Sequence, residues 1–199
     1  MRPLLILALL APTLAACGDD DTPVFADYFW RVRCDIAGGC PPDIVDHEII
    51  ATNGQEGAAV QCDLTNFGDT FNLNATATQG DFGIAIRNAS FPAAGGGVVG
   101  SSCTVTVTEQ GNFYEGGCSA APPSGECTMA PVGGVAPNCP SPCQLSVQRM
   151  DEEMGPTIRA SLFCAGLGLR ADPSRVVEVN QPGDPTMPAR LRIVNCPGS

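Results

Sequence analysis

The feature that most constrains the fold of this chain is a series of short segments in which apolar and polar residues alternate. Alternation with a period of two is typical of β-strands that bury one face. Gly, Asn and Asp residues suited to turns separate the segments. Such strands favour an antiparallel β-sandwich, because each half-buried strand needs a second sheet to cover its apolar side. The segments fall at residues 60–64, 71–77, 82–86, 103–107, 113–118, 143–147, 158–164 and 189–194, with a further candidate at 47–51.

One segment near the N-terminus fits a helix instead. Thr22-Pro23 has the residue types of a helix start. Apolar residues then recur at spacings of four, three and four, at Phe25, Phe29, Val32 and Ile36. We therefore expect a short helix over Pro23–Ala37, ended by two glycines. A strand is the competing interpretation, because Tyr28, Trp30 and Val32 also alternate with their neighbours.

The first residues form an apolar leader that ends in Leu14-Ala15-Ala16-Cys17. The leader starts with Arg2 and is shorter than the ~20 apolar residues that span a bilayer. Its end resembles the lipobox of bacterial lipoproteins. The resemblance implies cleavage before Cys17, lipidation of that cysteine with a diacylglyceryl group and usually a further acyl chain such as palmitate, and an anchor on the extracytoplasmic side of a cell-envelope membrane. It covers only the leader, and no domain family is identified.

Ten of the eleven cysteines remain once Cys17 is set aside. An even number in an exported chain predicts disulfides rather than thiolates for metal. In an antiparallel hairpin, the residue numbers of two facing positions always add up to the same value. This rule pairs Cys103 with Cys118 and Cys143 with Cys164. Loop closure and elimination suggest the remaining pairs, Cys34–Cys40, Cys127–Cys139 and Cys62–Cys196. These pairings stay hypotheses, because spacing alone does not fix connectivity. Cys139-Pro-Ser-Pro-Cys143 has a zinc-like spacing but lacks a partner pair.

The net charge of −11 argues against binding to nucleic acid or to anionic headgroups. The chain contains no lysine, which excludes Schiff-base chemistry. Two stretches lack periodicity, residues 119–142 and 171–188, and we expect both to be surface loops. Long loops in compact domains are often functional, so these two are the expected contacts for a ligand.

The only histidine lies among acids, in Asp43-Ile-Val-Asp46-His47-Glu48. An imidazole beside carboxylates suits a general base or a divalent-metal site. The alternative, which we favour, is a solvated loop that leads into a strand. The chain has no Gly-x-Ser-x-Gly motif, so an α/β-hydrolase site is not supported.

Three other groups have weaker functional interpretations. Asp151-Glu152-Glu153, and likewise Asp63, Asn66 and Asp69, offer oxygens to calcium but lack the pattern of a calcium loop, and soluble turns are favoured. Tyr28-Phe29-Trp30 is suited to stacking on a sugar or dipping into a lipid interface, although burial against the sheet is favoured. Asn74 and Asn88 match the glycosylation pattern, which is incidental in a bacterial lipoprotein.

The sequence thus predicts a mainly β protein, an antiparallel, disulfide-linked β-sandwich with a short N-terminal helix. The expected parts are a signal peptide (1–16), an acidic tether (17–22), a helical segment (23–40) and the sandwich-like domain (41–199). We expect a non-catalytic structural or binding module in the bacterial cell envelope, anchored to a membrane through Cys17, with an envelope protein or glycan as partner. We expect no cofactor, metal or nucleic acid. The alternative is a secreted carboxylate-dependent hydrolase using Asp46, His47 and Glu48, or a glycan-binding protein.

Overall fold

The computed structural model describes residues 23–34, 44–94, 96–99, 102–123, 141–152 and 155–198. Within these residues the chain forms strands and turns and no helix. The strands are β1 (Phe25–Cys34), β2 (Ile44–Thr52), β3 (Ala58–Asn66), β4 (Thr70–Gln79), β5 (Phe82–Pro92), β6 (Gly96–Gly97), β7 (Thr104–Glu109), β8 (Asn112–Ser119), β9 (Cys143–Glu152), β10 (Gly155–Leu169), β11 (Asp172–Asn180) and β12 (Ala189–Val194).

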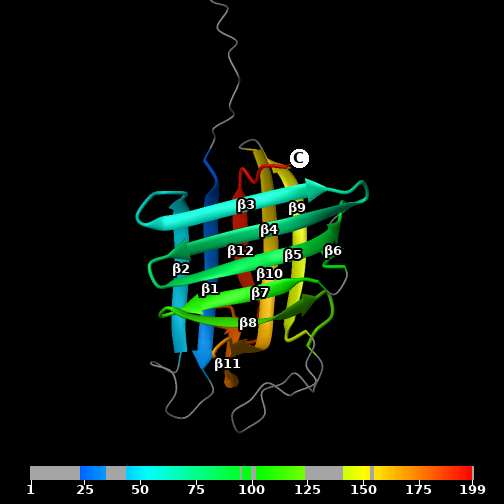
Figure 1. Cartoon of the computed structure of the whole chain (residues 1–199). Helices are drawn as coiled ribbons and strands as arrows, with labels where there is room; N and C mark the ends of the chain where they lie inside the picture. Colours follow the sequence, from blue (N-terminus) through cyan, green and yellow to red (C-terminus); the bar gives the residue numbers. More distant parts are fainter. Residues whose placement is uncertain are drawn as a thin grey trace, which may run out of the picture.

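The strands form a β-sandwich whose two layers cross steeply (Figure 1). The front layer contains β3, β4, β5, β7 and β8, and the back layer contains β2, β1, β12, β11, β10 and β9. Hydrogen bonds continue from one layer to the other, because β8 pairs in parallel with β9 and also meets the end of β10. Nearly all other pairings are antiparallel, as the alternating sequence predicts.

The core lies between the layers and is filled from alternate positions of the strands. In β4, for example, Phe71, Leu73, Ala75 and Ala77 are buried while their neighbours are partly exposed. Burying an apolar side chain of this size contributes about 1.5–3 kcal/mol. The alternation read from the sequence therefore identifies which residues of each strand form the core.

Three predicted disulfides are present. Cys103 and Cys118 face each other across the β7–β8 hairpin, and Cys143 faces Cys164 across β9–β10, as the constant-sum rule requires. The pair left by elimination, Cys62–Cys196, joins β3 to the segment after β12. The pairs Cys34–Cys40 and Cys127–Cys139 involve residues or side chains outside the described part of the chain.

The expected N-terminal helix is wrong. Phe25–Cys34 is strand β1, which pairs with β2 on one side and with β12 and β11 on the other. In this strand Tyr28 and Trp30 are completely buried, whereas Phe29 is only partly buried. The alternation with a period of two is thus the correct interpretation. The segment forms a strand because β2, β12 and β11 provide backbone hydrogen-bond partners on both of its sides.

The expectation of a loop over residues 171–188 is also wrong in its first half. Asp172–Asn180 is strand β11, which lies against both β1 and β10. Val177 and Val179 are buried, and Glu178 between them faces outward. Of the four prolines in this stretch, Pro173 lies near the start of β11, and the other three lie between β11 and β12. The turn-rich connection is limited to the residues between β11 and β12.

Candidate functional site

The acids around His47 do not converge with it. Asp46, His47 and Glu48 lie on β2, so their side chains alternate between the two faces of the sheet. His47 points between the layers, and both acids are exposed on the outside. The Arg31 guanidinium donates to both carboxylate oxygens of Asp46, at 2.6 and 3.0 Å, and this bonding lowers the pKa of Asp46. Asp43 lies outside the described residues.

His47 instead belongs to a cluster between the layers, formed with Glu109, Trp30 and Phe82. His47 Nε2 and Glu109 Oε2 lie 2.5 Å apart, and their side chains are only 9% and 11% exposed. The imidazole centroid lies 5.0 Å from Trp30 and 4.8 Å from Phe82. His47 and Trp30 come from the back layer, and Glu109 and Phe82 from the front layer. We call these residues the His47–Glu109 cluster, and its geometry joins the two layers.

The remaining acid-rich candidates are occupied by contacts within the protein. Glu152 accepts hydrogen bonds from Arg159 at 2.9 Å and from Arg192 at 2.7 Å, which lower its pKa. Asp151 pairs with Arg149, and Glu153 lies outside the described residues. Asn66 accepts a hydrogen bond from the Gly68 amide within its own turn. Asp63 lies on β3 and Asp69 in the turn before β4.

The metal candidates find no support in the described part of the chain. No group of three or more His, Cys, Asp or Glu residues is placed there to hold an ion. Cys143 is bonded to Cys164 and so is not a thiolate ligand. The proposed glycosylation residues also have structural contacts, since Asn74 donates to Asn72 and accepts from the Asn88 amide.

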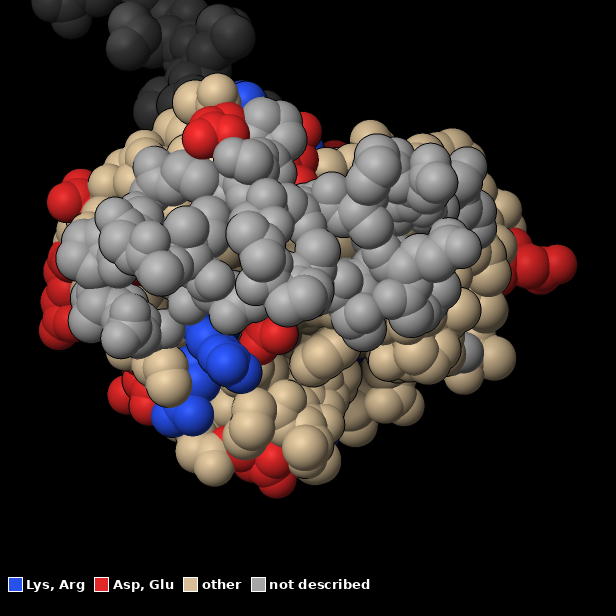
Figure 2. All heavy atoms as spheres, turned by 90° about the horizontal axis from the view of Figure 1, so that it is seen from below, with Lys and Arg blue, Asp and Glu red and all other residues tan. Residues whose placement is uncertain are grey.

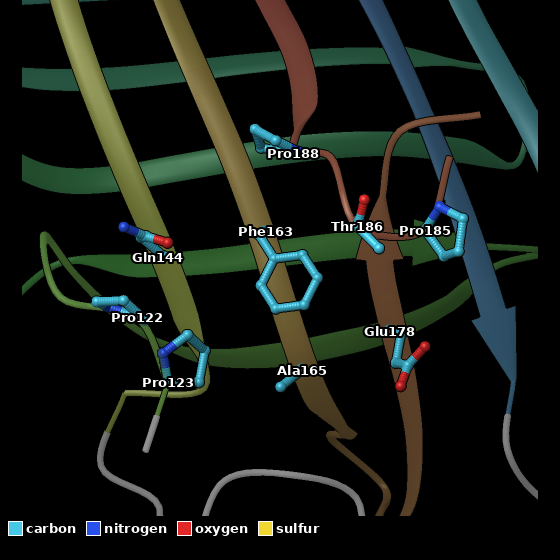
Figure 3. Close-up of a pocket in the computed structure, with 9 residues that line it drawn as sticks. All are labelled: Pro122, Pro123, Gln144, Phe163, Ala165, Glu178, Pro185, Thr186 and Pro188. Carbon is cyan, nitrogen blue, oxygen red and sulfur yellow. The ribbon is translucent and has the colours of Figure 1, made fainter. Parts of the chain in front are cut away.

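A pocket of about 480 Å³ opens on the outer face of the back layer (Figure 3). Phe163 and Ala165 of β10 form its floor, with Gln144 of β9 on one side and Glu178 of β11 on the other. The segments after β8 and after β11 supply the rest of the wall, namely Pro122, Pro123, Pro185, Thr186 and Pro188. We call this the Phe163 pocket. It brings together described parts of both stretches that the sequence marked as contacts for a ligand.

Local contacts position the floor of the Phe163 pocket. Gln144 and Phe163 are paired across β9 and β10, directly beside the Cys143–Cys164 disulfide on the inner side. The Gln144 side-chain amide donates to the Ala120 carbonyl at 3.1 Å, which holds the segment that carries the pocket prolines. These contacts fix the polar and apolar groups of the pocket before any ligand arrives.

A glycine also allows the segment after β8 to approach β6 closely. At Gly97, which pairs with Ser146 of β9, a Cβ atom would lie 2.3 Å from the Ala120 Cβ. Any larger residue would push the proline-bearing segment away from the sheet. Sequence reasoning missed the role of Phe163 and Glu178, because their meeting depends on β11 lying beside β10.

The chemistry of the Phe163 pocket is that of a binding site. Six of its nine lining residues are apolar, and the polar ones are an amide, a carboxylate and a hydroxyl. Mostly apolar pockets with a few placed polar groups are typical of small-ligand sites. Arg33 lies 3.7 Å from the Glu178 carboxylate and partly balances its charge.

The outer face of the back layer continues beyond the pocket. Ser161, two residues before Phe163 on β10, pairs with Ser146 of β9 and with Arg190 of β12. The Arg190 guanidinium lies over the Phe29 ring, 5.7 Å from its centroid. Of the three neighbouring aromatic residues in β1, Phe29 alone therefore faces outward.

None of the described residues forms a helix with the length and hydropathy needed to cross a bilayer. No family model, curated protein or solved structure matches this chain, so its function has to be inferred from the residues themselves.

Proposed function

We propose that this chain is an exported bacterial lipoprotein whose β-sandwich is a non-catalytic binding module. The lipobox resemblance at Cys17 supports the anchor, and the three disulfides agree with an oxidising compartment outside the cytoplasm. The dispersal of Asp46, His47 and Glu48 removes the residues that the hydrolase alternative relied on. Binding is then the activity that the Phe163 pocket supports best.

One observation carries the proposal. Two segments separated by about sixty residues in sequence meet around Phe163, and the first is held to the sheet by the hydrogen bond from Gln144 to the Ala120 carbonyl. A protein with a purely structural role would not need a pocket between two proline-bearing segments, so the pocket favours a binding role. Preformed pockets reduce the entropy lost when a ligand is bound.

The position of the pocket suits a ligand away from the membrane. β1 begins at Phe25, beside Thr157 and Val194 of the neighbouring strands, and the lipid anchor would attach a few residues before that end. Phe163 lies six residues further along β10 than Thr157, a distance of about 20 Å at the usual rise of a strand. A tether of five residues would thus hold the opposite end to the membrane and leave the pocket facing outward.

The anchor is tested by metabolic labelling with palmitate in cells that express the full chain. The wild type should carry label and sediment with membranes, whereas Cys17→Ser should carry none and lose that association. Phe113→Ser, a change of an exposed residue in the folded part, should keep the label. A wild-type protein that is unlabelled and retains Met1 would contradict the export and anchoring part of the proposal.

The binding role is tested by co-sedimentation with delipidated envelope fragments from the same cells. The wild type should sediment with them, and Phe163→Arg should not, because the longer charged side chain fills the pocket. Phe113→Arg is the matched control, since Phe113 is an exposed phenylalanine of β8 in the other layer. Equal sedimentation of all three proteins would contradict a role for the pocket.

A further inference from the structure

We propose that the Phe163 pocket binds a neutral saccharide, and that a longer saccharide extends from it over Ser161 towards Phe29 and Arg190. This inference rests on the proposed binding role and assigns its ligand class. It is carried by the groups that surround the Phe163 ring and by the residues that continue the same outer face.

The Phe163 ring lies between two hydrogen-bonding groups that come from neighbouring strands (Figure 3). Gln144 on β9 offers an amide, and Glu178 on β11 offers a carboxylate. A pyranose ring has the complementary design, with C–H groups on its face and hydroxyls around its edge. The face of the sugar can cover the phenyl ring while its hydroxyls reach the amide and the carboxylate.

An apolar peptide side chain fits this pocket less well. It would cover Phe163 but would also remove water from Glu178 and Gln144 without replacing the lost hydrogen bonds. Glu178 keeps its contact with Arg33, and Gln144 keeps its hydrogen bond to Ala120, but the peptide replaces none of the hydrogen bonds to water that both groups lose. The hydroxyls of a saccharide avoid that loss because each can donate to a carboxylate and accept from an amide.

Charge favours a neutral saccharide over an acidic one. The pocket lining contains one acid and no basic residue, and the whole chain carries a net charge of −11. Acidic side chains are also spread around the described surface at the end of the molecule near β11 (Figure 2). A polyanionic glycan would be repelled by this field.

The surface next to the pocket can accept further sugar units. Ser161 places a hydroxyl group on β10 opposite Ser146 of β9, whose own hydroxyl donates to the Gly96 carbonyl at 3.3 Å. Ser161 is followed across β12 by Arg190, which covers Phe29. Neighbouring strands lie about 4.8 Å apart, so Phe29 is two strands away from Phe163. The inference therefore predicts tighter binding as the oligosaccharide becomes longer.

Isothermal titration of the full-length lipidated protein in detergent tests this inference. The probes are N-acetylglucosamine and its tetramer, glucose and cellotetraose, polygalacturonate as an acidic glycan, and an apolar proline-rich peptide. At least one neutral tetramer should bind, at least tenfold more tightly than its own monosaccharide, and polygalacturonate should not bind. Phe163→Ala should weaken the tetramer by about tenfold or more, which corresponds to about 1.4 kcal/mol.

Three further variants separate the parts of the surface. Glu178→Gln keeps the shape and should weaken both sugar lengths by about threefold to tenfold, because it loses the charged acceptor. Phe29→Ala should weaken the tetramer and leave the monosaccharide unchanged. Phe113→Ala, whose ring likewise lies beneath an arginine (Arg170) but in the other layer, should change neither. Thermal unfolding of each variant confirms that it is folded.

Two results would overturn the saccharide inference. The first is a folded wild-type protein that binds none of the neutral sugars more tightly than about 10 mM. The second is binding of the peptide or of polygalacturonate in place of the neutral sugars. Either result would leave the broader binding proposal standing if Phe163→Arg still abolishes sedimentation with envelope fragments, so the two failures are distinguishable.

Discussion

The His47–Glu109 cluster and the Phe163 pocket differ both in the type of residue they contain and in how exposed those residues are. The cluster contains an imidazole and a carboxylate, the groups that general acid–base chemistry uses, yet both are nearly buried and paired across the layers. The pocket contains prolines and a phenylalanine, which signal no chemistry in a sequence, yet it is open to ligands. Residue type alone therefore does not show which of the two regions is buried and which is open to solvent.

The two regions differ because successive side chains of a strand point to opposite faces of the sheet. In β2 the side chain of His47 enters the sandwich, and its acidic neighbours leave it. In β10 the cysteine at position 164 enters the sandwich, and Phe163 beside it faces outward. One residue of shift in either strand would exchange the buried and exposed sets. Four predictions test whether the two regions are as separate as their positions indicate.

The largest effect should come from the disulfide that joins the layers. Cys62 and Cys196 are 134 residues apart, against 15 for Cys103 and Cys118. In the chain-entropy model, loss of the longer loop costs about 5 kcal/mol and loss of the shorter about 3 kcal/mol. Urea denaturation of the two double alanine variants measures this difference. Equal losses would show that the longer bridge is not a special support of the layered fold.

The next effect concerns the cluster itself. Glu109→Ala leaves a buried imidazole without its hydrogen-bond partner and should lower the free energy of unfolding by about 1–3 kcal/mol. The double variant His47→Leu/Glu109→Leu should recover much of that loss, because it leaves no uncompensated polar group. Trp30, the only tryptophan, reports on this region by its fluorescence. A loss below 1 kcal/mol for Glu109→Ala would mean that the pair does not hold the layers together.

Phe163→Ala should lower the free energy of unfolding less than the two changes above, but it should weaken ligand binding strongly. The ring is half-buried on the outer face, so its removal should cost about 1 kcal/mol. Trp30 fluorescence should not change, because the tryptophan lies between the layers. A changed emission spectrum in this variant would show that the pocket and the cluster are coupled.

The smallest effect is expected at Asp46, on the outside of β2. Its lowered pKa means that the unfolded chain takes up the proton first as the pH falls. The stabilisation is complete above the ordinary aspartate pKa of about 4 and is lost as the pH falls through the lower folded value. Asp46→Asn should therefore cost a few tenths of a kcal/mol at pH 7. In urea unfolding the difference from wild type should shrink below pH 4, and a difference that grows there would contradict the assignment.

The hairpin registers could be predicted from sequence because antiparallel partners are fixed once a turn is located. Cys103 and Cys118 are the clearest case, and Cys62–Cys196 followed only by elimination. The segment at Phe25–Cys34 satisfied both a helical and a strand period, and only the presence of β2, β12 and β11 beside it decides between them. Propensity and pattern within one segment do not contain that information.

The candidate site was predictable only in part. The two aperiodic stretches were identified as ligand contacts, and each contributes to the wall of the Phe163 pocket. The floor was not predictable, because Glu178 lies in a stretch whose sequence predicts a loop but which forms strand β11. The contact between His47 and Glu109 was not predictable either, because Glu109 is distant in sequence and lies in the other layer.

The central place of β1 has a consequence for how the sandwich forms. The first described strand needs β12, the last described strand, as its immediate neighbour. Contacts of such long range form late and slowly. The back layer therefore cannot close until the segments that form both strands have been synthesised.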